Sequence, residues 1–162
     1  MAFINIAKNA TVTFSSKSQW STDEDSSEIV TAKHNRDFSF HTNREYNPWV
    51  ELDLGSSYVL QSIVVFNRKD VCQNIAYTLQ VELSNDKVNY DLIHKGFLPF
   101  NEKIEFNLKG LKRARYIKLS INGFNYFHLS KIEVFIDDSK NSGVIFDSPK
   151  IPDIIAINIE YI

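Results

Sequence analysis

The chain has 162 residues, of which 43% are hydrophobic and 23% are charged, and its formal net charge is −2. This length suits one globular domain with a core of its own, and this composition excludes a disordered chain. The small net charge and the lack of a Lys/Arg block exclude the electrostatic footprint of nucleic-acid binding, and no apolar run is long enough to span a membrane.

Runs with the residue pattern of β-strands recur along the chain. They are Thr11–Ser15, Trp49–Leu54, Tyr58–Phe66, Tyr77–Ser84, Tyr90–His94, Lys103–Leu108, Arg115–Ile121 and Lys131–Ile136. Several of them alternate apolar and polar residues, which places one face of the strand on a core and the other in water. Turn residues such as Asn122-Gly123 separate them. The sequence therefore predicts an all-β, antiparallel sandwich of about eight core strands with almost no helix.

The segments outside these runs predict the domain organisation. Gln19 to Arg44 is polar and without periodicity, so we expect long loops that cross one end of the sandwich. We expect the sandwich to cover residues 1–136, a polar linker to cover 137–150, and an extra strand or the stump of a neighbouring domain to cover 151–162. Met1 to Ala10 lacks the pattern of a signal peptide, and the lone Cys72 is compatible with the cytoplasm, so the compartment stays open.

Enzyme motifs are missing from the sequence. The glycines are too scattered for a phosphate-binding loop, and there is no Gly-x-Ser-x-Gly elbow. Cys72 with a distant histidine is a possible nucleophile pair, but a free cysteine near strands is more often a small buried side chain. The run Asp23-Glu24-Asp25 offers paired carboxylates, yet adjacent acids in a loop usually form a solvated run. We predict a domain that is not an enzyme.

The stretch from Phe40 to Gly55 carries Pro48-Trp49 followed by Val50-Glu51-Leu52-Asp53-Leu54-Gly55. In this order it resembles the discoidin, or coagulation-factor type C, family of the galactose-binding-like superfamily. Further matches follow in the same order, at Ile63–Arg68, Leu83–Asp86, Ala114–Leu119 and His128–Phe135. The resemblance spans about Ile4 to Ile136. It implies a jelly-roll sandwich that binds its ligand through loops at one end.

Within that family, the spacing of His41, Arg68 and Asp70 is similar to the motif of the F-type lectins. Such a trio suits a sugar, whose vicinal hydroxyls both donate and accept hydrogen bonds. The resemblance implies a sugar site built on these three residues. Tyr46 and Phe40 flank the trio and are candidates for rings that stack on a sugar, the alternative being rings that pin the loop. Cys72 is a candidate contact at the rim of the site, the alternative being no role.

Two positions depart from the F-type motif. Ile75 stands where a second basic residue belongs, and Val71-Cys72 stands where many of these lectins carry adjacent cysteines. The departures favour a sugar preference other than fucose, as in the family 32 carbohydrate-binding modules. The structural alternative for the trio is a surface ion pair between arginine and aspartate and a histidine that holds a loop carbonyl. Trp49 is more typical of a core, as is Trp20, although the polar neighbours of Trp20 would suit an exposed ring.

Many members of the family hold a structural calcium ion beneath the binding loops. The resemblance places its ligands at Asn35, Asp37, Ser39 and Glu133. Oxygen ligands of this kind suit a hard cation. The alternative is a loop that is held by its own Asx hydrogen bonds.

The function that the resemblance implies is a non-catalytic, lectin-like module whose partner is a glycan. Two alternatives stay open, a protein- or phospholipid-binding adhesion domain and a structural accessory domain of a larger glycosyltransferase-type protein. Against a lipid surface, the loops lack a spike of adjacent apolar residues and a basic collar. A neighbouring domain or a homo-oligomer would supply avidity.

Overall fold

The computed structural model describes residues 2–31 and 36–143. Most of its elements are strands. They are β1 (Phe3–Asn5), β2 (Thr11–Phe14), β3 (Glu45–Tyr46), β4 (Trp49–Phe66), β5 (Leu79–Ser84), β6 (Tyr90–His94), β7 (Lys103–Ile121), β8 (Phe124–Asn125) and β9 (Lys131–Asp137), with one α-helix in the described part, α1 (Asp25–Thr31), and 3₁₀ helices at Ala7–Asn9, Gln73–Thr78 and Asp138–Lys140. The predicted antiparallel, all-β fold is confirmed. No helix in the described part is long and apolar enough to cross a membrane.

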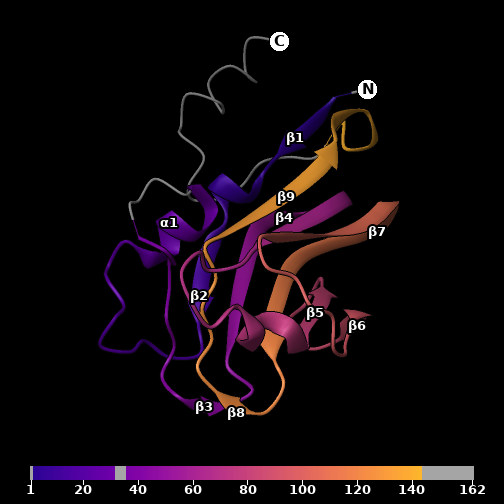
Figure 1. The fold of residues 1–162 in the computed structure, drawn as a ribbon. Coiled ribbons are helices and arrows are strands. Elements are labelled where there is room, and N and C mark those ends of the chain that lie inside the picture. The colour runs from indigo at the N-terminus through magenta and orange to yellow at the C-terminus, as the bar shows by residue number, and fades with distance from the viewer. Residues whose placement is uncertain (1, 32–35, 144–162) are drawn as a thin grey trace.

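The strands form one folded sheet with the order β1-β9-β4-β7-β5-β6, in which β2 also pairs with β4, and every pairing is antiparallel. β3 and β8 form a separate two-stranded ribbon. Figure 1 shows this ribbon at one end of the molecule and β1 with the end of β9 at the other.

The two long strands, β4 and β7, pass through both halves of the sandwich. The first half of β4 pairs with β2, and its second half pairs with β9. Its register against β7 shifts between Asp53 and Tyr58, where Gly55 has a φ of 84°, a backbone conformation that side chains with a Cβ disfavour. The sequence predicted two strands in each case, because the residues at the bend read as a turn.

The core lies between the two halves and follows the alternation in the sequence. Leu79, Val81 and Leu83 of β5 are buried, whereas Gln80 and Glu82 between them are partly exposed. Burial of each such side chain contributes about 1.5–3 kcal/mol. The alternation therefore decides which face of each strand turns inward.

A short helix lies where the sequence predicted loops alone. The Asp25 carboxylate accepts hydrogen bonds from the Thr22 backbone N–H at 3.2 Å and from the Thr22 hydroxyl at 3.1 Å, as in a capping box. Asp25 is fully buried, so the expectation that Asp23-Glu24-Asp25 is a solvated run is wrong at this position. Asp25 therefore has a structural role at the start of this helix.

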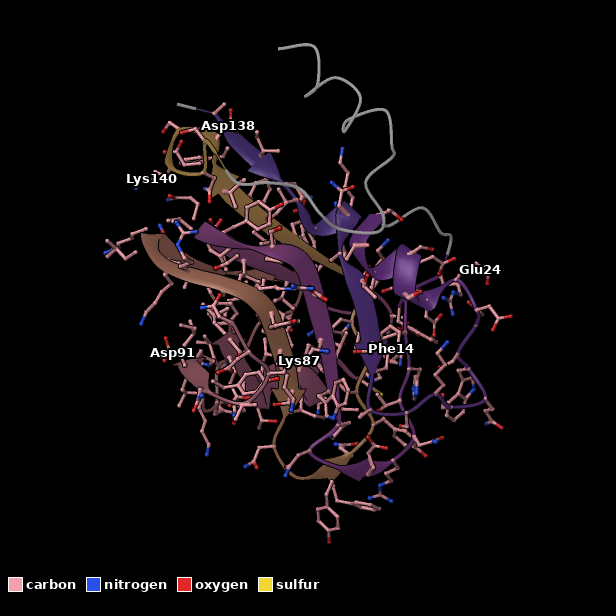
Figure 2. All side chains as sticks on the ribbon, turned by 180° about the vertical axis from the view of Figure 1, so that it is seen from behind. Phe14, Glu24, Lys87, Asp91, Asp138 and Lys140 are labelled. Atoms are coloured by element: carbon pink, nitrogen blue, oxygen red, sulfur yellow. The ribbon has the colours of Figure 1, made fainter. Side chains whose placement is uncertain are left out.

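The boundary between the sandwich and the predicted linker lies later than Ile136. β9 continues to Asp137, and the Asn141 side chain bonds to Val59, accepting from its N–H at 2.7 Å and donating to its carbonyl at 3.0 Å. Asp138 and Lys140 lie at the top of Figure 2, away from the β3–β8 end. The linker prediction is therefore wrong for residues 137–143, and the predicted extra strand or stump lies outside the described residues.

Candidate functional site

The backbone of His41 is fixed by two neighbouring segments near the β3–β8 end. On one side, Ser39 and Thr42 donate from their backbone N–H groups to the carbonyls of Leu129 and Phe127, at 2.8 and 2.9 Å. On the other side, the His41 carbonyl accepts from the Ser18 N–H at 3.0 Å. The loop before β3, which carries His41, therefore lies between the segment after β2 and the segment after β8.

Arg68 follows the end of β4 and is locked in place by its neighbours. Its Nε and Nη2 donate to the two carboxylate oxygens of Asp70 at 2.5 and 2.8 Å, and its guanidinium lies 4.6 Å from the centre of the Phe38 ring. The hydrogen bonds from Arg68 lower the pKa of Asp70 to about 2, so this carboxylate is ionised at physiological pH. The pair presents a fixed fork of donors and acceptors.

Four aromatic rings surround the imidazole of His41. Ring centres lie 4.7 Å away at Trp20, 5.4 Å at Phe38, 5.2 Å at Tyr126 and 5.1 Å at His128. Trp20 remains 47% exposed, so its ring is accessible to a ligand. Of these rings, Trp20 and Phe38 also line the space beside His41, where they suit the C–H face of a sugar.

The hydrogen bonds of His41 fix its tautomer. Its Nδ1 lies 2.9 Å from the carbonyl of Thr42, which can only accept, so Nδ1 carries the proton. Burial lowers the pKa of His41, and the positive charge of Arg68 lowers it further. The imidazole is therefore neutral at pH 7, and its Nε2 is left as a hydrogen-bond acceptor.

The space beside these groups is a cavity of about 190 Å³, which we call the His41 cavity. It is lined by Trp20, Phe38, His41 and Arg68. A larger cavity of about 410 Å³ shares Arg68 but has neither His41 nor Trp20 in its wall. We place the site in the smaller one, because charged and aromatic groups converge there.

The structure brings His41, Arg68 and Asp70 into one region, but not the other predicted sugar-binding residues. Phe40 is 1% exposed and packs in the core against Phe14 and Phe127, so its predicted stacking role is wrong. Phe38, two residues earlier in the same loop, lines the His41 cavity instead.

Tyr46 and Cys72 are exposed but do not line the His41 cavity. Tyr46 lies on β3, where its ring packs at a tilt against Phe124, with the ring centres 4.8 Å apart. Cys72 has a left-handed backbone at the start of the 3₁₀ helix Gln73–Thr78. Ile75, at the position of the missing basic residue, packs against the core.

Sequence reasoning missed Phe38 and His128. Phe38 differs from Phe40 only in which way its side chain turns, and nothing in the sequence distinguishes the two. His128 is 1% exposed, and burial together with the charge of Arg68 lowers its pKa to about 3. The His128 imidazole is therefore neutral at pH 7, and its ring centre lies 5.1 Å from that of His41.

The predicted calcium ligands that lie in the described residues each have another partner. The Asp37 carbonyl accepts from the Lys69 N–H at 3.0 Å, beyond the end of β4, whereas Glu133 pairs with Val64 inside the sheet. The Glu133 carboxylate lies 3.3 Å from Lys131 Nζ. The Ser39 hydroxyl donates to the carbonyl of Leu129 at 3.2 Å, and Asn35 lies outside the described residues.

The described residues contain no group of three or more His, Cys, Asp or Glu side chains that could hold a metal ion. The predicted ligand set contains only two such side chains, Asp37 and Glu133, together with Ser39 and Asn35, and we derive no role for calcium from it. Calcium binding stays a prediction, which melting curves with and without a chelator test directly, because a ligand of the native state alone raises the melting temperature.

Comparisons with known proteins agree with this fold. The lectin domain of lectinolysin complexed with Lewis B antigen is 25% identical, with a TM-score of 0.69 over 83% of this chain and 97% of that one. A Streptococcus pneumoniae fucose binding module, SpX-3, is 19% identical, with a TM-score of 0.70 over 83% of this chain and 98% of that one.

A pentraxin fusion protein of Xenopus laevis is 27% identical over 111 residues, which are 64% of this chain and 26% of that protein, so the chain spans about a quarter of its length. The family model of the NedA-like, galactose-binding domains of F5/F8 type C matches residues 22–119. The chain thus belongs to the F5/F8 type C family of galactose-binding-like domains.

Proposed function

We propose that the chain is a non-catalytic glycan-binding module whose His41 cavity holds a sugar. The observation that carries the proposal is the fixed pair of Arg68 and Asp70 beside a neutral His41 in an aromatic-walled cavity. Support comes from the similar structures, one a fucose binding module and another a lectin domain with Lewis B bound.

Each group has a role that suits a sugar. The Arg68 guanidinium donates to hydroxyl oxygens, while Asp70 and His41 Nε2 accept from hydroxyl hydrogens. The Trp20 ring covers an apolar face of the sugar. Water competes for every hydroxyl, so the affinity of one site is expected to be weak, and a millimolar dissociation constant corresponds to only about 4 kcal/mol.

Replacing Arg68 with alanine is expected to weaken glycan binding by at least about 1.5 kcal/mol, or roughly tenfold, because it removes charge-assisted hydrogen bonds. The measurement is calorimetric titration with the strongest ligand from a glycan array. Arg115→Ala is the matched control. Arg115 also forms a two-point ion pair, with Asp53 at 2.8 and 3.1 Å, but Asp53 lies in β4 and pairs with Thr11 rather than with a residue of the site.

The control should bind the glycan as the wild type does. Equal affinity of Arg68→Ala and wild type for that glycan would place the site elsewhere. A loss that is matched by Arg115→Ala would indicate a general effect of ion pairs on the fold.

A further inference from the structure

A second cavity adjoins the His41 cavity and shares the Trp20 ring with it. Its volume is about 400 Å³, and it is lined by Ser18, Gln19, Trp20, Asn43, Arg44 and Tyr126. Hydroxyl, amide, guanidinium and aromatic groups thus meet in one wall, which is the mixture that a ligand site presents. We call it the Arg44 cavity. None of the residues that line it is acidic.

The wall of the Arg44 cavity is held by the same contacts that fix His41. The Ser18 hydroxyl lies 3.1 Å from His41 Nδ1 and accepts from the Trp20 backbone N–H at 3.2 Å. The Asn43 backbone N–H donates to the Ser16 hydroxyl at 2.9 Å. Tyr126 meets the Trp20 ring edge-on at 5.9 Å. A ligand would find this wall already organised, which lowers the entropic cost of binding.

Arg44 differs in its partners from three other arginines of the chain. Arg36, Arg68 and Arg115 each form an ion pair with a carboxylate. Arg44 forms no ion pair with any residue in the described part of the chain, and its guanidinium lies 5.0 Å from the centre of the Phe124 ring.

The ring contact holds the planar face of the guanidinium of Arg44 and leaves its N–H fork for another partner. A guanidinium fork matches a carboxylate or a sulfate in geometry as well as in charge. An anionic group in the Arg44 cavity would supply the partner that the described residues do not.

We propose that the Arg44 cavity is a second subsite, which takes a carboxylate or sulfate carried by the sugar next to the one in the His41 cavity. The inference rests on the proposed function. It narrows the ligand class from any glycan to an acidic oligosaccharide that crosses the Trp20 ring, with its terminal sugar at Arg68 and its anionic group at Arg44.

The test uses an array of fucosylated and galactosylated oligosaccharides, each in neutral, sulfated and sialylated forms. Wild type is expected to bind an acidic form about fivefold more tightly than its neutral counterpart, with a preference that shrinks as salt rises from 50 to 500 mM. Arg44→Gln should abolish the preference and leave neutral forms within about twofold of wild type. Arg113→Gln, at an exposed arginine that donates to the Ser57 carbonyl, is the matched control.

The outcomes separate the two proposals. Binding of neutral forms with no acidic preference, or a preference that survives in Arg44→Gln, overturns the second subsite and leaves glycan binding intact. The sulfated and sialylated arms show which anion the subsite prefers. If wild type binds no member of the array while its melting curve shows a folded protein, glycan binding and the second subsite both fail.

Discussion

Replacing Arg36 with alanine is expected to lower the free energy of unfolding by about 3 kcal/mol, because it leaves a buried carboxylate without its cation. The Nη2 of Arg36 donates to Asp25 at 2.7 Å, to Glu28 at 2.5 Å and to the carbonyl of Ser39 at 3.1 Å. The Asp25 side chain is fully buried, so water cannot replace the lost partner. Urea unfolding of wild type and variant measures the difference.

Arg115→Ala is again a suitable control for this loss. The side chains of Arg115 and Asp53 are 38% and 26% exposed, so breaking that pair should cost under about 1 kcal/mol. If the two variants lose the same stability, the burial of Asp25 has no energetic consequence. The double variant Asp25→Ala/Arg36→Ala should recover part of the loss, since it removes the unpaired charge as well.

Lowering the pH from 7 to 5 is expected to cost about 2 kcal/mol of stability through His128 alone. The pKa of His128 is about 3 in the folded protein and 6.5 in an unperturbed chain. At a pH between these two values, the unfolded state therefore binds a proton that the folded state does not bind. Stability is therefore complete above pH 6.5 and falls with decreasing pH, by about 1.4 kcal/mol per pH unit. His41, whose pKa is also lowered, adds to the fall.

His128→Leu should flatten this pH dependence. Leucine has nearly the volume of histidine, cannot titrate, and removes the buried Nδ1 that has no hydrogen-bond partner. Urea unfolding at pH 8, 7, 6 and 5 compares the two proteins. The two curves of stability against pH should run parallel above pH 7 and separate below it, and parallel curves down to pH 5 would show that His128 does not carry the effect.

The strands of this fold could be predicted because their residue pattern depends on residues that are close together in sequence. Leu79-Gln80-Val81-Glu82-Leu83 alternates because its strand is buried on one face, and the pattern is visible without coordinates. The continuity of β4 through Gly55 was not predictable, since a left-handed glycine serves equally in a turn and in a bend. Local pattern predicted the strands but not how they join.

The candidate site was likewise predictable from the sequence only in part. The resemblance to the F-type motif implied a common region for His41, Arg68 and Asp70. The ion pairs of Arg36 could not be predicted, because its partners, Asp25 and Glu28, depend on how a helix and a loop pack together. Phe38 was missed, and Phe40 was wrongly placed in the site, for a related reason. Which ring faces the core depends on contacts to Phe14 and Phe127, which lie far away in sequence.

The shared wall at Trp20 makes this residue an optical reporter of occupancy. Indole fluorescence shifts to shorter wavelength when water leaves the ring, and the half-exposed Trp20 borders both cavities. The second tryptophan, Trp49, lies at the start of β4 beneath Lys118 and lines neither cavity. An emission change that is absent from Trp20→Phe and retained in Trp49→Phe would therefore follow ligand uptake with no label attached to either molecule.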